Sequence, residues 1–204
     1  ITYNFSALPI KPDGTDGLLL LLHFDNVSGE NLTINSSRTL AIDWSNNGFN
    51  ATVMTNSSNG GAKWNSTGRF GGTLELDGID DFINVSGDSK FDFGTSASFT
   101  IGSWIKPSTN TLHEVIERYS VPDPSYFTCR LNNLSRFVFA IRDDSSNEPL
   151  VIADTSQISA GTWHNLICVR DVSSDSLIVY LDGVRIGSTT DTTTNSIATT
   201  ASIS

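Results

Sequence analysis

The stretch GTWHNLICVRDVSSDSLIVYLDGVRIG, residues 161–187, carries the clearest structural pattern in the chain. A polar segment, Asp171–Asp175, separates two runs of strand-forming residues, and Asp182-Gly183 separates the second run from a third. Asp-Gly is a strong signal for a two-residue hairpin turn, because both residues tolerate a positive φ. The stretch therefore predicts three consecutive antiparallel strands.

Similar runs occur along most of the chain, separated by turn residues, and helical periodicity is nearly absent. We predict strands at Leu18–Asp25, Phe49–Met54, Thr73–Asp77, Phe82–Ser86, Ser98–Lys106, Leu112–Tyr119, Tyr126–Leu131, Arg136–Arg142, Pro149–Ala153, Trp163–Asp171, Ser176–Leu181 and Val184–Ser188. Many short strands without a long helical window predict an all-β fold, a two-sheet antiparallel β-sandwich of the jelly-roll type.

Composition excludes two classes of partner. The 204 residues carry a net charge of −10, which disfavours binding to the phosphates of nucleic acid. The longest apolar run, Leu18–Leu22, is far shorter than the ~20 residues of a membrane helix, so we expect no membrane insertion.

The acceptor pattern for N-glycosylation, Asn-X-Ser/Thr, is unusually frequent. Nine of the 17 asparagines head such a triplet: Asn4, Asn26, Asn31, Asn35, Asn50, Asn56, Asn65, Asn84 and Asn133. We predict a secreted glycoprotein with covalent glycans, located outside the cell or at its surface. The alternative is that a chain rich in Asn, Ser and Thr collects such triplets by chance.

The two cysteines, Cys129 and Cys168, each lie inside a predicted strand. If those strands are neighbours, a cross-strand disulfide is geometrically possible. Two reduced cysteines that pack as small hydrophobic residues are an equal alternative.

No linker divides the chain, and we predict one domain over residues 18–204, preceded by an extended arm, residues 1–17, with alternating Ile1, Tyr3 and Phe5. The last residues, 187–204, are rich in Ser and Thr and predict a polar linker, an O-glycosylated stalk, or a final strand over Ile197–Ile203.

Several motifs resemble one known family, in matching order. They are Asp43-Trp-Ser-Asn-Asn-Gly48, Arg69-Phe-Gly-Gly-Thr-Leu-Glu-Leu-Asp-Gly-Ile-Asp-Asp-Phe-Ile83, Phe99-Thr-Ile-Gly-Ser-Trp-Ile-Lys-Pro107, Gly161–Arg170 and Leu177–Gly187. Together they resemble the laminin G-like jelly roll of the concanavalin A-like lectin/glucanase superfamily. The resemblance implies the sandwich fold, but this scaffold hosts lectins, adhesive modules and glycanases alike.

The family's pattern continues beyond the point that corresponds to Ser204, so we expect either that the chain is a fragment or that the missing final strand or strands come from elsewhere. An open sheet edge favours strand addition from a neighbour. We therefore consider copies of the chain as partners, joined head to tail by donation of the arm, residues 1–17, into a filament.

The resemblance also implies a structural calcium ion, because relatives often carry one in these loops. The positions that match are Asp43, Asn46, Asp80 and Asp81, and calcium prefers such hard oxygen ligands. The alternative is that aspartate simply begins turns well.

Aromatic side chains near loops are candidates for carbohydrate binding, namely Trp44, Trp64 and Tyr119, with surface polysaccharide as the partner. Packing at the rim or in the core is the alternative for each. We expect Trp104 and Trp163 to fill the space between the sheets and His164 to point to the opposite face.

These observations favour a non-catalytic extracellular protein with a structural or adhesive role. A lectin-like carbohydrate-binding module is the first alternative. A β-glucan hydrolase using Glu75 and Asp80 is the second, since retaining glucanases of the superfamily place a Glu-X-Asp-X-X-Glu motif on one strand, but here the third acid is Asp80 and Gly78 precedes it.

Overall fold

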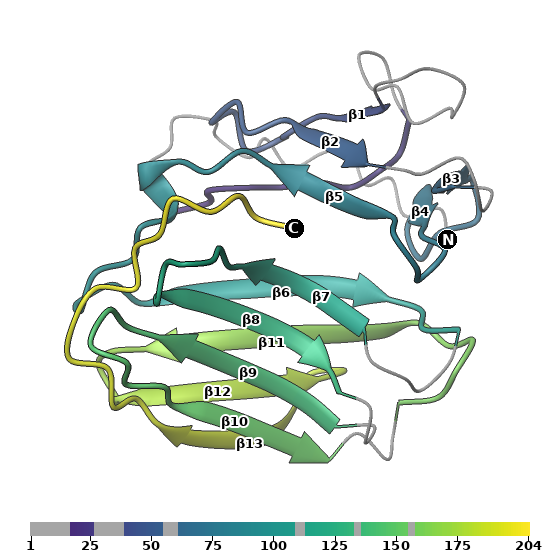
Figure 1. Cartoon of the computed structure of the whole chain (residues 1–204). Coiled ribbons are helices and arrows are strands. Elements are labelled where there is room, and N and C mark those ends of the chain that lie inside the picture. The colour runs from purple at the N-terminus through teal and green to yellow at the C-terminus, as the bar shows by residue number, and fades with distance from the viewer. Residues whose placement is uncertain (1–16, 27–38, 55–60, 109–112, 133–135, 155–157) are drawn as a thin grey trace. The chain divides into compact units, whose positions relative to one another are not determined.

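The computed structural model describes residues 17–26, 39–54, 61–108, 113–132, 136–154 and 158–204 (Figure 1). These residues divide between two compact units, one within residues 1–86 and the other within residues 87–204. Among the described residues, no helix has the length and apolar composition that a membrane span requires.

The second unit contains eight strands in two four-stranded antiparallel sheets (Figure 1). One sheet has the order β10-β9-β8-β7 and the other has the order β13-β12-β11-β6. The strands are β6 (Phe99–Ile105), β7 (His113–Arg118), β8 (Tyr126–Leu131), β9 (Arg136–Arg142), β10 (Leu150–Asp154), β11 (His164–Asp171), β12 (Ser176–Leu181) and β13 (Val184–Thr190). The predicted two-sheet sandwich is therefore confirmed in this unit.

Aromatic rings join the inner faces of the two sheets. The Phe99 ring of β6 lies 5.8 Å from the Phe127 ring of β8 and meets the Phe139 ring of β9 edge-on at 6.4 Å. Strand β11 alternates strictly between buried and half-buried residues, as expected of a strand with one face in the core. Burial of these apolar side chains is the main favourable contribution to folding.

The two sheets come especially close where β13 passes β10. A Cβ atom built on Gly187 of β13 would lie 2.9 Å from the Val151 side chain and 3.3 Å from Ala153. Only a residue without a side chain allows this approach.

The expected roles of Trp104 and His164 are reversed. Trp104 is 38% exposed on the outer face of β6, so the prediction that it fills the space between the sheets is wrong. His164 is buried instead, with Nδ1 2.8 Å from the Asp182 carboxylate and Nε2 accepting the Ser159 backbone N–H. Each nitrogen of the buried imidazole has a polar partner, which offsets the cost of its burial.

A fully buried arginine, Arg118, holds the end of the chain on this unit. Its guanidinium donates to the backbone carbonyls of Phe91, Thr199 and Ala201, and it pairs with the Asp92 carboxylate at 2.8 Å. These acceptors come from two segments far apart in the sequence. The guanidinium therefore fixes both segments against β7.

A second buried arginine, Arg170, likewise holds two segments together, residues 94–97 and residues 191–193. It donates to the Asp191 carboxylate at 2.7 Å, to the Thr193 hydroxyl, and to the backbone carbonyls of Gly94 and Ala97. Both partners of the ion pair are almost completely buried. Because each charge is paired and hydrogen-bonded, the cost of removing it from water is offset.

The segment 191–204 packs as an extended strap rather than as a full strand. Ile197 is buried, and Ile203 forms one isolated antiparallel bridge with Arg118 of β7. The backbone groups of Ser204 and Glu117 exchange two hydrogen bonds next to that bridge. Of the alternatives for this segment, the strand over Ile197–Ile203 comes closest, although only its last residues pair.

The first unit contains β1 (Thr39–Ala41), β2 (Ala51–Met54), β3 (Lys63–Asn65), β4 (Thr73–Glu75) and β5 (Phe82–Val85). Strands β1, β2 and β5 form a three-stranded antiparallel sheet, and β3 and β4 form a hairpin. The strands over Thr39–Ala41 and Lys63–Asn65 were missed by the sequence analysis because each is only three residues long.

The predicted strand at Leu18–Asp25 is absent, because its backbone bonds to the turn that contains Asp43 and Ser45 and forms no ladder with a neighbouring strand. The Asp43 carboxylate accepts the Leu21 N–H, and the Ser45 hydroxyl and Asn47 amide donate to the Leu19 carbonyl. A side-chain turn thus replaces the ladder of a sheet.

The predicted arm, residues 1–17, lies outside the described residues except for Gly17, so strand donation stays a prediction. The predicted single domain over residues 18–204 also stays a prediction, since the units are each described by themselves.

The ionisation of the Asp143 carboxylate makes the stability of the second unit depend on pH. Burial opposes its ionisation, but hydrogen bonds from the Asn147 side chain and from the backbone N–H groups of Thr194, Asn147 and Asn195 outweigh burial and lower its pKa to about 2. A lowered pKa contributes stability that is present above pH ~4 and lost as the pH falls toward 2, worth about 2 kcal/mol. We expect D143N to lower the free energy of unfolding in urea at pH 6 and to reduce its fall between pH 4 and 2. The control is D144N, at an exposed neighbour, and parallel pH profiles for D143N and the native protein would contradict this assignment.

Candidate functional site

The outward face of the β10-β9-β8-β7 sheet, which we call the outer face, carries a row of polar side chains on a buried floor. In β8, Phe127 and Cys129 point into the core, so the alternation turns Tyr126, Thr128 and Arg130 outward. Their register partners on β9 are Arg142, Ala140 and Val138, and those on β7 include Glu117 and Glu114. Val138 and Ala140 are buried, although they lie on this face.

One end of the outer face holds an acid and a base on neighbouring strands. Glu114 accepts a hydrogen bond from the Thr128 hydroxyl at 3.2 Å and lies 3.9 Å from the Arg130 guanidinium. Burial and the charge of Glu117 raise the pKa of Glu114, although Arg130 and Thr128 act in the opposite direction. A perturbed carboxyl beside a cation is a common feature of binding sites.

The other end holds an aromatic pair. The Tyr126 hydroxyl donates to the Glu148 carboxylate, and its ring meets the Tyr119 ring edge-on at 5.7 Å. Tyr119 is 51% exposed and follows β7 directly. Burial and the Glu148 carboxylate raise the pKa of Tyr126, so its hydroxyl stays a donor.

Both arginines of the outer face have unused donors. Among the described residues, the buried Nε atoms of Arg130 and Arg142 make no hydrogen bond. Because these Nε atoms are enclosed by protein, a ligand can contact only the remaining part of each side chain, of which 43% is exposed at Arg130. The face therefore offers donors, acceptors and an exposed aromatic ring to a polar ligand.

The three aromatic candidates from the sequence do not form one set. Trp44 and Trp64 belong to the first unit, whereas Tyr119 belongs to the second. Trp44 is 39% exposed, and its ring lies 4.8 Å from the His23 ring at an angle of 31°. The Trp64 indole N–H donates to the Phe24 carbonyl at 2.9 Å, so part of its polar edge is already used.

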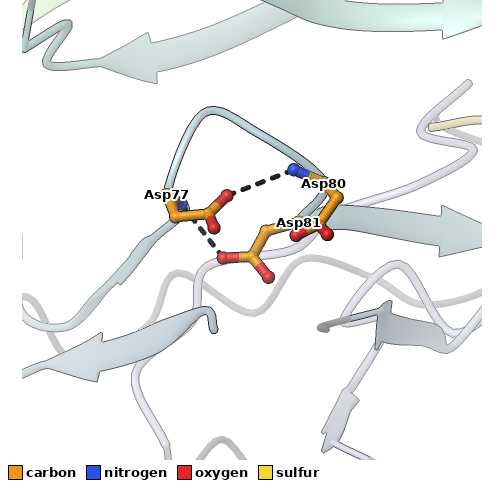
Figure 2. Close-up of side chains that lie close together, drawn as sticks. All are labelled: Asp77, Asp80 and Asp81. Atoms are coloured by element: carbon orange, nitrogen blue, oxygen red, sulfur yellow. Dashed lines mark hydrogen bonds between the residues drawn. The ribbon is translucent and has the colours of Figure 1, made fainter. Parts of the chain in front are cut away.

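A loop of the first unit brings three aspartates together. One carboxylate oxygen from each of Asp77, Asp80 and Asp81 lies within 4.8 Å of the others (Figure 2). The Asp77 carboxylate accepts the Ile79 and Asp80 N–H groups, and the Asp77 N–H donates to Asp81. One buried oxygen of each aspartate has no hydrogen-bond partner. Opposite calcium ligands are about 4.8 Å apart, so these oxygens fit around one ion.

The other two predicted calcium ligands lie outside this group. Both oxygens of the buried Asp43 accept hydrogen bonds, from the Leu21, Ser45 and Phe49 N–H groups and the Ser45 hydroxyl. Asn46 occupies the same turn, with a left-handed backbone at φ 67°. The structure thus groups Asp80 and Asp81 with Asp77 rather than with Asp43, and the calcium site stays a prediction.

The two residues of the hydrolase alternative do not share a strand. Strand β4 ends at Glu75, whose carboxylate accepts the Asn65 side-chain amide at 2.7 Å, and Asp80 lies in the loop that follows. The alternation that aligns two carboxylates on one strand therefore does not apply here.

Sequence reasoning identified Tyr119 but missed its neighbours on the outer face. The alternation of polar and apolar residues in Tyr126–Leu131 already indicated that Tyr126, Thr128 and Arg130 share one face of a strand. Only the register of β7, β8 and β9 shows that Glu114, Arg130 and Arg142 share a face.

A family model described as the concanavalin A-like lectin/glucanases superfamily matches residues 77–204. No curated protein sequence matches the chain.

Solved structures with the same fold include the binding domain of Paraclostridial Mosquitocidal Protein 1, with 17% identity, a TM-score of 0.64, and coverage of 89% of this chain and 44% of that chain. The binding domain of botulinum neurotoxin serotype D has 15% identity and a TM-score of 0.60, covering 85% and 40%. An S-layer domain-containing protein from Clostridium thermocellum has 19% identity and a TM-score of 0.50, covering 83% and 71%. This chain therefore spans less than half the length of the two toxin domains.

The raised pKa of Glu114 gives a test of the electrostatics of the outer face. A raised carboxyl pKa disfavours the charged form, so its contribution to stability is favourable below pH ~4 and lost as the pH rises. We expect E114Q, which keeps the acceptor for Thr128, to raise the melting temperature slightly at pH 7, on the order of 1–2 °C, and to leave it unchanged at pH 3. Calorimetry at the two pH values measures this, with D144N, at an exposed position, as the control. A lower melting temperature of E114Q at pH 7 would contradict this prediction, because it would show that the Glu114–Arg130 ion pair outweighs the cost of burying the charge.

Proposed function

Because the chain belongs to the concanavalin A-like lectin/glucanases superfamily, we propose that it is a non-catalytic binding module that recognises a carbohydrate on the outer face. The observation that supports this most directly is that the same face presents the exposed Tyr119 ring and the half-exposed Arg130–Glu114 pair. The superfamily also contains hydrolases, but the acids Glu75 and Asp80 lack the shared strand that double displacement uses.

The chemistry of the outer face suits a polyhydroxylated ligand. Sugar hydroxyls both donate and accept, and here the acceptors Glu114 and Glu148 stand near the donors Arg130 and Arg142. The exposed ring of Tyr119 offers an apolar surface for the C–H face of a sugar ring, with Tyr126 supporting it from the side. Acids and bases occur together, so the face favours a sugar over a strongly charged ion.

A calcium ion is proposed for the loop of the first unit. Asp77, Asp80 and Asp81 would hold it through their unpartnered oxygens, with backbone carbonyls or water completing the six to eight ligands. The ion would neutralise three like charges and stiffen the loop.

We further propose that the protein is extracellular and N-glycosylated, with a structural or adhesive role that includes assembly through the arm. Asn50, Asn65 and Asn84 lie in described segments. The Asn65 amide already donates to Glu75, so a glycan there would replace that bond, whereas Asn50 uses only its carbonyl oxygen, toward the Asp43 N–H. The other triplets, except Asn26, lie outside the described residues: Asn4, Asn31, Asn35, Asn56 and Asn133.

The carbohydrate proposal predicts that R142A weakens binding. We expect a glycan array to identify a ligand, and titration with that glycan to show a loss of roughly 10- to 100-fold for R142A and R130A, because each removes charged hydrogen bonds. Y119A should also lower affinity through lost stacking.

The matched control is R185A, since Arg185 is an exposed arginine on β13 of the other sheet. Equal affinity of R130A, R142A and the native protein would exclude the outer face. Loss of binding in W44A alone would instead place the site in the first unit.

The calcium proposal predicts that chelator lowers the melting temperature of the native protein and not that of D80N. Isothermal titration should give a binding heat that D80N abolishes and that D144N, an exposed aspartate of the other unit, retains. Absence of heat together with an unchanged melting temperature in chelator would remove the ion from the proposal.

A further inference from the structure

Two buried thiols face one another between the sheets of the second unit. Cys129 lies on the inner face of β8 and Cys168 on the inner face of β11, and they are 2% and 1% exposed. Each strand is central in its own four-stranded sheet. The cysteines are therefore not cross-strand neighbours, as the first sequence hypothesis required, but residues of opposite sheets.

Independent contacts place them opposite each other. The Phe99 ring of β6 contacts the Phe127 ring of β8, and Cys129 lies two residues beyond Phe127. Ile101 lies two residues beyond Phe99 and is the register partner of Cys168. Burial, together with the neighbouring Cys129 thiol, raises the pKa of Cys168.

We propose that Cys129 and Cys168 form a disulfide that joins the two sheets through the core. Both are free thiols in this structure, and the bond requires their Cα atoms to come within about 7 Å of one another. Sandwich folds accept such a cross-link, since immunoglobulin domains carry one between their sheets.

The bond forms by thiol–disulfide exchange with a small disulfide such as oxidised glutathione. One cysteine thiolate attacks the donor, releases its first thiolate and forms a mixed disulfide. The second cysteine thiolate then attacks the protein sulfur of that mixed disulfide and releases the second thiolate. The two cysteines lose two protons and two electrons, and the donor leaves as two thiols.

Burial determines when this exchange takes place. A donor cannot reach either sulfur in the closed sandwich, so the exchange belongs to the folding chain, before β8 and β11 close on one another. The reduced native protein should therefore resist both oxidation and alkylation. The bond closes a loop of about 40 residues that contains β9 and β10, and the constraint favours the folded state.

The test uses the full chain, unfolded, reduced, and refolded in mixtures of reduced and oxidised glutathione. The products are then unfolded in acid and alkylated, and intact mass separates the bonded form, without adducts, from the form with two adducts. We expect the refolded protein to be bonded. For each condition, the measured quantity is the glutathione ratio, [GSH]²/[GSSG], at which half of the protein is bonded. This ratio should be about 100-fold higher in native buffer than for the same chain in urea.

Two adducts on the refolded native protein, or equal ratios in buffer and in urea, would overturn the proposal. A melting temperature that falls in reductant for the native protein, and not for C129A/C168A, would support it. The mass measurement on the unsubstituted chain decides the question even where that variant folds poorly. Carbohydrate binding at the outer face plays no part in either readout.

Discussion

Two buried guanidinium groups organise the second unit. Arg118 and Arg170 lie on neighbouring edges of the core, and each bonds at the same time to the segment 88–97 and to the strap, residues 191–204. Neither segment forms regular pairing along its length, so these charged hydrogen bonds replace a sheet ladder. Removing one partner of such a pair costs roughly 3–5 kcal/mol, because the other charge stays buried without compensation. Arg118 therefore anchors β7, the strand that also carries Glu114 of the outer face.

The sequence was most informative where hairpins are local. The strands over residues 164–190 are joined by short turns, and the turn residues alone specify their pairing. At Leu18–Asp25 the apolar run indicated a strand, but Asp43 and Ser45 supply its partners from about 22 to 26 residues away. No local pattern encodes such a long-range replacement. The buried position of His164 was missed for a related reason, since its partner Asp182 lies in the turn between β12 and β13.

The candidate site was also predictable only where the pattern is local. Exposed aromatic residues near loops could be identified directly, and Tyr119 does border the outer face. The charged members needed the register of three strands, including the irregularity between Glu114 and Ile116 that sets which residues of β7 face outward. Among the candidate metal ligands, Asp80 and Asp81 were predicted through the family motif, whereas Asp77 joins them through the backbone turn that its own side chain stabilises.

The strap also determines how the second unit responds to mechanical load. A force pulling on Ser204 would meet the β7 bridge and Arg118 first, then the Asp143 carboxylate, and last Arg170. These anchors lie in series along the strap, so they would break one after another, as in a zipper, rather than sharing the load in shear. Each rupture would lengthen the chain by a few residues while both sheets stayed closed. Under load, the strap would therefore detach before the two sheets separate.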